Sequence, residues 1–355
     1  MKELLIISNE QFGYHTDSFK YCQNLKDTYT ITYFCFYKGQ PKISLDGVEN
    51  IYIPWDRSKI VRSVAFFFKA LKAMFFCKGV TFIVYFNGFT LLHLLLPWKK
   101  AILDIRTLSV SPNKTKRYLE DLFLKVTAKT FSYVTVVSQG VKEKLNLSSK
   151  KTFILPLGAD CISEKRKDYK KVHLLYVGTL MGRKILDTVK GFHKYILFNK
   201  DAEITYDIVG DGSEKEEIKR YIEQNKLTGQ IVMHGYLPHQ QLQPLFDRCN
   251  IGVSYVPITE YYTNQPATKT FEYAMSGLYV VATNTKSNRE VITPDNGILI
   301  EDSVNSFYEA MKQISLTSHC FNEAAIRSSL SQYSWNSVIN TYLLPVLKAI
   351  EKTKV

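Results

Sequence analysis

The residues best suited to binding an anion follow a short apolar run in the second half of the chain. In "YVGTLMGRKILDTVKGF", Gly178 and Gly182 precede two adjacent cations, Arg183 and Lys184. Glycines allow backbone amides to approach a phosphate, and two cations can neutralise a diphosphate. Basic residues at the start of a helix are also common on solvated surfaces, so this segment alone allows either interpretation.

A second set of polar residues lies in "NQPATKTFEYAMSGLYVVATN", residues 264–284. Lys269 precedes Glu272 by three residues, and a β-branched run after the small-residue turn predicts a buried strand. We expect Glu272 in the first turn of a helix just outside the sheet, where a carboxylate can accept hydrogen bonds from two vicinal ribose hydroxyls. The alternative is an acidic side chain that only complements the helix dipole.

Two glycine turns lie between these segments, in "VGDG" (209–212) and "HGYL" (234–237). We expect Gly210, Gly235 and Tyr236 to frame a nucleobase. Taken alone, each turn is better explained as a tight connection between a strand and a helix.

The elements that must position these residues alternate between strands and helices. In the first half the expected strands cover 4–8, 29–37, 51–55, 81–86, 101–105 and 133–138, and in the second half 173–178, 204–209, 231–237, 251–257, 278–283 and 297–300. Helical patterns separate them, the most amphipathic at 113–130. Alternation of this kind predicts an α/β fold with parallel, doubly wound sheets, and 355 residues suit two Rossmann-like domains that face one another.

The composition excludes several classes of protein. With 45% hydrophobic and 22% charged residues, the chain is globular and not disordered. Its six cysteines contain no C-x-x-C pair, which argues against a disulfide framework and a zinc site and fits a reducing cytosol. The N-terminal apolar run is too short for a signal peptide.

Charge is distributed unequally between the two halves. Residues 1–158 hold 23 Lys+Arg and 11 Asp+Glu, a net charge of +12, which leaves +1 of the total +13 for the remainder. Such asymmetry favours an anionic partner, either nucleic acid or a membrane surface. No RNA- or DNA-binding module is recognisable, and the aromatic residues lie in apolar runs rather than between basic residues, so we expect no nucleic-acid partner.

The stretch 62–78, "RSVAFFFKALKAMFFCK", predicts a basic amphipathic helix. Arg62, Lys69 and Lys72 fall on one side of it, and its phenylalanines could enter a membrane interface. The alternative is a helix that packs on the sheet and leaves one edge wet. The next stretch, 79–98, has no charged residue, but Asn87 and Gly88 divide it into a strand, a turn and a short helix, which argues against a membrane span.

The order of these motifs over 172–302 resembles the nucleotide-sugar domain of family 4 retaining glycosyltransferases, which have the GT-B fold. The residues that carry the likeness include "HGYLP", "CNIGVSYVP", "KTFEYAMSGLYVVAT" and "NGILI". The resemblance is looser over 100–160 and weakest over 1–99. It implies an acceptor domain at 1–160, a donor domain at 161–332 and a C-terminal helix at 333–355 that crosses back to the first domain.

The family's donor residues transfer unevenly. Lys184 matches the lysine on the donor diphosphate, and Glu272 matches the glutamate usually found on the ribose. The family's other glutamate is replaced by Asn264, and its arginine after the strand glycine by Thr179, for which Arg183 is a candidate substitute.

Two matches fall in the first half. Arg106 lies where many relatives carry a histidine or arginine that faces the transferred sugar. Gly13 matches the loop that approaches the donor phosphate.

The resemblance implies transfer of a sugar from a nucleoside-diphosphate sugar to a glycan or polyprenyl-linked acceptor, with the anomeric configuration retained. No D-x-D pair occurs, so we expect no metal and no cofactor. The implied setting is surface-polysaccharide synthesis in the cytoplasm, peripherally on the inner face of the membrane. Two alternatives remain: a nucleotide-sugar epimerase of the same fold, and a catalytically inactive GT-B protein.

Overall fold

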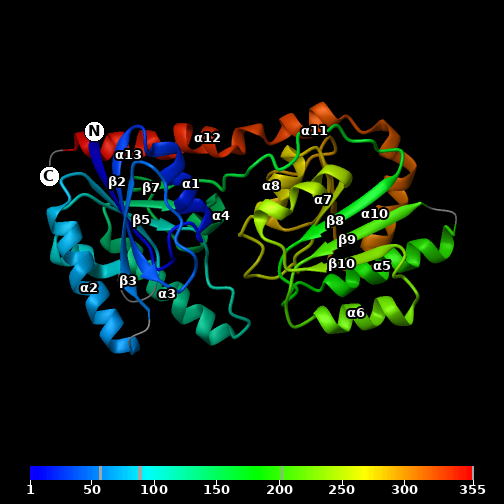
Figure 1. Ribbon diagram of the computed structural model, residues 1–355, viewed down its shortest axis with the longest axis horizontal. Coiled ribbons are helices and arrows are strands. Elements are labelled where there is room, and N and C mark those ends of the chain that lie inside the picture. The colour runs from blue at the N-terminus through cyan, green and yellow to red at the C-terminus, as the bar shows by residue number, and fades with distance from the viewer. Residues whose placement is uncertain (56–57, 87–89, 201–202, 354–355) are drawn as a thin grey trace. The chain divides into compact units, whose positions relative to one another are not determined.

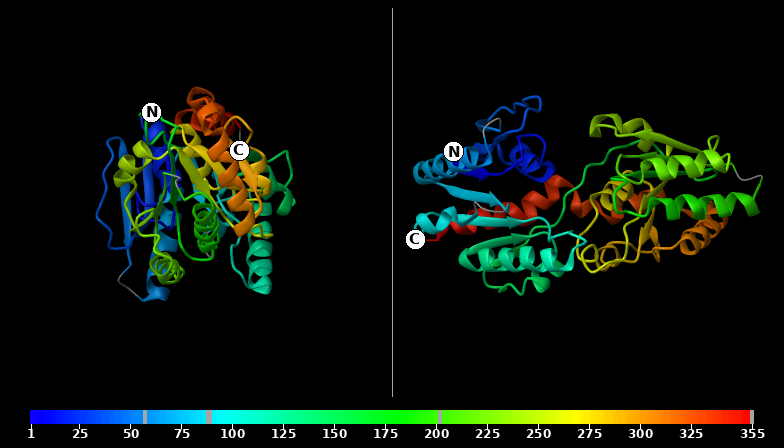
Figure 2. Two further views of the ribbon diagram at one scale, coloured as in Figure 1. Left: turned by 90° about the vertical axis from the view of Figure 1, so that its right-hand side faces the viewer. Right: turned by 90° about the horizontal axis from the view of Figure 1, so that it is seen from below.

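The computed structural model describes residues 1–55, 58–86, 90–200 and 203–353 (Figure 1). The chain divides into two compact units. Unit 1 contains residues 1–157 together with 335–355, and unit 2 contains residues 158–334. Each unit is built on one parallel sheet, and Figure 2 shows helices on both faces of each sheet. Asn87 and Gly88, the predicted break in the apolar stretch, lie outside the described residues.

The sheet of unit 1 has seven parallel strands in the order β3-β2-β1-β4-β5-β6-β7. Their bounds are β1 Lys2–Ile7, β2 Tyr29–Tyr37, β3 Val48–Pro54, β4 Val80–Val84, β5 Ala101–Ile105, β6 Tyr133–Val136 and β7 Thr152–Ile154. The central strands are apolar runs rich in β-branched residues, as expected for a sheet covered on both faces. The strand predictions are confirmed. The three-residue β7 was not predicted as a strand, because it contains only two apolar residues, Phe153 and Ile154.

Six α-helical segments and one short 3-10 helix complete unit 1 within its described residues. They are α1 Thr16–Leu25, α2 Lys59–Phe76, the 3-10 helix η1 Thr90–Leu95, α3 Lys114–Thr130, α4 Gln139–Lys144, and the C-terminal α12 Trp335–Val338 and α13 Leu344–Lys352, which a π-helical turn over Ile339–Leu343 joins. The side chains of Asn113 and Ser138 accept from the backbone amides of Lys116 and Val141 in the first turns of α3 and α4, which explains where these helices begin.

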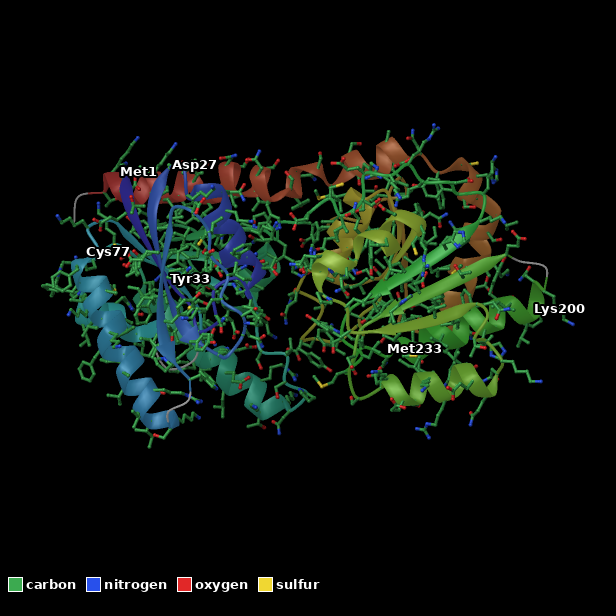
Figure 3. The ribbon with its side chains drawn as sticks, in the orientation of Figure 1. Met1, Asp27, Tyr33, Cys77, Lys200 and Met233 are labelled. Atoms are coloured by element: carbon green, nitrogen blue, oxygen red, sulfur yellow. The ribbon has the colours of Figure 1, made fainter. Side chains whose placement is uncertain are left out.

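The C-terminal helices are part of the core of unit 1. The buried ring of Tyr21 lies edge-on to Phe82 at 5.6 Å and to Trp335 at 6.2 Å between centroids. Tyr33, labelled in Figure 3, belongs to the same core and shares a 2.8 Å hydrogen bond with the Ser18 hydroxyl. Residues from the two ends of the chain therefore bury one another.

Unit 2 has six parallel strands in the order β10-β9-β8-β11-β12-β13. Their bounds are β8 Val172–Val177, β9 Ile204–Val209, β10 Ile231–Gly235, β11 Ile251–Ser254, β12 Tyr279–Thr283 and β13 Gly297–Ile300. The order reverses between β8 and β11. In open α/β sheets, ligands bind outside the carboxyl ends of the strands at such a reversal.

The described helices of unit 2 pack on both faces of this sheet (Figure 2). They are α5 Ile185–Phe198, α6 Lys215–Gln224, the 3-10 helix η2 His239–Gln241, α7 Gln243–Arg248, α8 Thr268–Met275, α9 Lys286–Arg289, α10 Val304–Thr317 and α11 Glu323–Ser329, with single 3-10 turns at Ser318–Cys320 and Ser331–Tyr333. Across both units, no helix in the described ranges is long and apolar enough to cross a membrane.

Candidate donor-binding site

The loop from β8 to α5 presents the two predicted cations at the reversal of the sheet. Gly182 has φ +67° and Lys184 φ +55°, so both adopt left-handed backbone conformations. Such a conformation is uncommon for a residue with a side chain, and it places Lys184 directly before the first turn of α5. Glu214 accepts from the Gly182 amide at 2.7 Å, which ties the loop to the start of α6.

Arg183 and Lys184 point to different partners. The Arg183 guanidinium lies over the Tyr262 ring, 4.3 Å from its centroid, whereas the Lys184 ammonium lies 3.2 Å from Asp302. Both cations are partly exposed. Either cation can therefore bind an anion near the loop only if it breaks or shares its present contact.

The three glycines of the predicted donor site have different local roles. Gly210 has φ +152°, and a Cβ there would lie 1.8 Å from the Gly178 carbonyl oxygen, so close packing of two loops explains why this position is glycine. The Gly210 amide donates to the Gly235 carbonyl at 2.8 Å, which joins the two turns. Next to them the Tyr236 ring is 74% exposed and available for stacking.

Glu272 is 3% exposed, yet its carboxylate is held between two basic groups. Lys269 donates to Oε2, and Nε2 of His239 lies 3.5 Å from Oε1. Burial opposes ionisation, but these two partners keep the pKa of Glu272 below its usual value. Because each carboxylate oxygen has two acceptor positions, the ionised group retains capacity for further donors.

The predicted position of Glu272 in the first helical turn was wrong. Helix α8 begins at Thr268, so Glu272 lies in the second turn and is buried among its neighbours. The sequence placed the helix start too late, because no side chain of the Ser, Asp or Asn type caps it at Ala267.

The two departures from the family pattern lie close to these groups. Thr179 Oγ1 accepts from the Met181 amide at 3.2 Å, so it shapes the loop without supplying charge. Asn264 follows Tyr262, the residue on which Arg183 stacks, in the segment between β11 and α8. Arg183 therefore contacts the segment that contains Asn264, the residue found where the family has its other glutamate.

In unit 1, Arg106 follows β5 but its guanidinium points inward. It donates to Asp17 at 2.5 Å and to the Leu155 carbonyl at 2.6 Å, and its exposed fraction is 7%. Although burial opposes the charge, Asp17 and Asp104 raise the pKa of Arg106 above its usual value. This geometry gives Arg106 a structural role, and contact with the transferred sugar remains a prediction.

Asp104 is fully buried beside this arginine. The Thr135 hydroxyl donates to its Oδ1 at 2.7 Å, and Oδ2 has no hydrogen-bond partner among the described residues. Burial raises the pKa of Asp104 to about 6, although Arg106 and Thr135 oppose that shift.

Gly13 lies in the loop after β1, with φ +90°. A Cβ there would lie 2.4 Å from Ile43, so both backbone conformation and packing require glycine. The neighbouring His15 accepts from the Ser18 amide at 3.3 Å and caps α1, a role that was not predicted from the sequence.

The predicted basic helix is α2, on which Lys69 and Lys72 are exposed. The Arg62 guanidinium instead stacks 3.6 Å from the centroid of Trp55. Phe68 and Phe76 are each 63% exposed on the same helix. No group of three or more His, Cys, Asp or Glu side chains in the described part of the chain could hold a metal ion.

One family model and several solved structures resemble this chain. Residues 171–316 match the family model described as glycosyl transferases group 1. This match and the fold support a glycosyltransferase. No curated protein matches the sequence.

Solved structures resemble the chain over nearly its whole length. A glycosyltransferase from Rickettsia africae has 15% identity and a TM-score of 0.75, and the match covers 99% of both chains. HepE from Anabaena has 11% identity and a TM-score of 0.75 over 98% of this chain and 100% of that one. Sucrose-phosphate synthase from Thermosynechococcus elongatus has 15% identity and a TM-score of 0.70 over 98% and 97%. The predicted GT-B fold is confirmed.

Proposed function

We propose that this protein transfers a sugar from a nucleoside-diphosphate sugar and retains the anomeric configuration. The observation that carries the donor class is Glu272, a buried and ionised carboxylate at the carboxyl edge of a sheet whose order reverses nearby. Vicinal ribose hydroxyls are suitable donors to such a group. The HepE structure, obtained with UDP and glucose, gives an example of a similar fold with such ligands.

The two cations would act on the leaving group. As the glycosidic bond breaks, negative charge grows on the donor diphosphate, and Lys184 with Arg183 would stabilise it. A donor phosphate oxygen would accept the proton of the attacking acceptor hydroxyl, so no protein base is required. Contact of Gly13 with the donor phosphates is implied by the family resemblance alone and stays a prediction.

The direct test is nucleoside diphosphate binding, measured by calorimetry with UDP and GDP. Glu272→Ala is expected to weaken the binding of diphosphate and nucleotide sugar by the same factor, because both carry the ribose. Loss of hydrogen bonds to a charged group costs about 1.5–3 kcal/mol. Glu309→Gln, an exposed carboxylate on α10, is the control. Unchanged affinity in a folded Glu272→Ala protein would exclude the ribose contact.

Retention is tested separately. With an active donor and acceptor pair, proton NMR of the first product must give the same anomeric configuration as the donor. An inverted product would contradict the family assignment while leaving the donor site intact. Interconversion of nucleotide sugars without transfer would favour the epimerase alternative.

For the acceptor we propose a glycan or polyprenyl-linked molecule at an anionic membrane, as in surface-polysaccharide synthesis on the inner face of the cytoplasmic membrane. The supporting observation is an apolar surface on unit 1. The 3-10 helix η1 contacts both α2 and α3, and exposed apolar side chains occur on all three: Phe68, Phe75 and Phe76 on α2, Leu94 and Leu95 on η1, and Tyr118, Leu119, Leu122 and Phe123 on α3. Lys69 and Lys72 are exposed on α2 as well.

Such a surface is expected to bind to a lipid bilayer, because its apolar side chains are then removed from water. Each basic residue near an anionic surface contributes about 1 kcal/mol, and exposed phenylalanines add apolar burial. We expect sedimentation with anionic vesicles but not neutral ones, and release by high salt. Lys69→Glu with Lys72→Glu should weaken sedimentation, whereas Lys219→Glu with Lys312→Glu in unit 2 should not. Failure to bind anionic vesicles at low salt would favour a soluble acceptor.

A further inference from the structure

Lys184, the predicted diphosphate ligand, pairs with an anionic side chain. Its ammonium lies 3.2 Å from Oδ2 of Asp302, which follows β13 and directly precedes α10. The lysine side chain is 55% exposed and the aspartate 23%. The pair is therefore open to solvent on the side of the lysine.

The carboxylate is held in place independently of the lysine. The same Oδ2 accepts from the backbone amide of Ile258 at 3.2 Å, in the loop after β11. Asp302 thus connects the loops that follow β8, β11 and β13. Because β8 and β11 flank the reversal of the sheet, these contacts lie where the diphosphate is proposed to bind.

A second carboxylate belongs to this electrostatic neighbourhood. Burial raises the pKa of Asp187, in the first turn of α5, while Lys184 and Lys190 lower it and Asp302 raises it further. Lys184 therefore offsets two carboxylates before any donor arrives. A diphosphate that binds to Lys184 must compete with them for its charge.

We infer that Asp302 is a positioning residue that occupies Lys184 in the donor-free protein, and that the donor diphosphate displaces it. This inference rests on the proposed donor site. Asp302 stays anchored to the Ile258 amide, and the lysine turns its ammonium to the phosphates. The ion pair thereby lowers the affinity for the donor and holds the Lys184 side chain beside the proposed diphosphate position.

The test is the affinity for UDP or GDP, whichever the wild-type protein binds more tightly, measured by calorimetry in low salt. Asp302→Asn removes the charge but keeps an oxygen that can accept from the Ile258 amide. An exposed ion pair contributes up to about 1 kcal/mol, so we expect about two- to fivefold tighter binding. Glu309→Gln breaks the similar Lys312–Glu309 pair, 2.9 Å long, and should change nothing.

A double mutant shows whether the effect passes through the lysine. Asp302→Asn should increase affinity much less in a Lys184→Ala background. An undiminished increase there, or unchanged or weaker binding in Asp302→Asn alone, overturns the inference. Absence of binding to the wild-type protein would contradict the proposed function as well, so the two failures are distinguishable.

Discussion

At the carboxyl ends of its strands, unit 1 buries an arginine beside two carboxylates, whereas unit 2 keeps its corresponding cations partly exposed. Arg106 is fixed by Asp17 and by backbone carbonyls. Lys184 and Arg183 instead make exposed contacts, with the Asp302 carboxylate and the Tyr262 ring. A buried ion pair that loses its cation destabilises the fold, whereas a cation in an exposed contact can exchange its partner for a ligand. We therefore expect a structural role for Arg106 and a chemical role for Lys184 and Arg183.

The largest loss of stability should follow from removing Arg106, the cation of the buried set. Arg106→Ala leaves Asp17 and Asp104 without their cation, and removing one partner of a buried pair costs about 3–5 kcal/mol. All three tryptophans of the chain belong to unit 1, so tryptophan fluorescence during urea unfolding reports that unit. If Arg106→Ala unfolds like the wild-type protein but loses turnover, Arg106 belongs to the catalytic machinery and the comparison fails.

Asp104 gives the second prediction, a dependence of stability on pH. Its pKa is raised from 3.8 to about 6 in the folded protein. A group with a raised folded pKa stabilises below its unfolded pKa and loses that contribution as pH rises to the folded value. Asp104→Asn should therefore remove a decrease of about 2–3 kcal/mol in unit 1 stability between pH 4 and 6.

Urea unfolding at several pH values, followed by tryptophan fluorescence, measures this difference. Glu143→Gln, on the exposed side of α4, is a suitable control. An identical pH profile for Asp104→Asn and the wild-type protein would mean that Arg106 keeps Asp104 ionised throughout.

Substitution of the exposed cations, Lys184 and Arg183, should lower activity and leave the free energy of unfolding unchanged. Lys184→Ala is expected to lower kcat more than donor affinity, because leaving-group charge is greatest in the transition state. A charged hydrogen bond is worth about 1.5–3 kcal/mol, or roughly a tenfold to hundredfold decrease in rate. Steady-state kinetics and an unfolding curve on the same sample separate the two effects. A stability loss as large as that of Arg106→Ala would contradict the division.

Arg183→Ala should have the smallest effect. Its stacking on Tyr262 at an exposed site is worth about 0.5–1 kcal/mol, so stability should hardly change. A decrease in kcat beside normal stability would support Arg183 as the substitute for the arginine that Thr179 replaces. Wild-type kinetics would leave that position without a cation and favour the inactive-protein alternative.

Sequence patterns predicted most of the fold, because β-branched runs that end at glycine turns depend on local physics. Lys184 and Glu272 were chosen from a glycine turn, from a helix before a strand and from the family resemblance, and their roles stay predictions. Their partners could not be predicted, since His239 and Asp302 reach them from separate loops. Asp17 and Arg106 are 89 residues apart, and nothing in either local sequence indicates that they pair. The feature of the sequence that could have indicated Asp302 is its position just after the predicted strand at 297–300.

The C-terminal helices have a consequence for how the protein is made. Trp335 and the residues up to α13 complete the core of unit 1, yet the ribosome adds them only after every residue of unit 2. During synthesis the first 157 residues must therefore wait with apolar surface uncovered, while unit 2 is already able to fold. Unit 1 is synthesised first but completes its core last, so chaperones have the longest time to bind its exposed apolar residues.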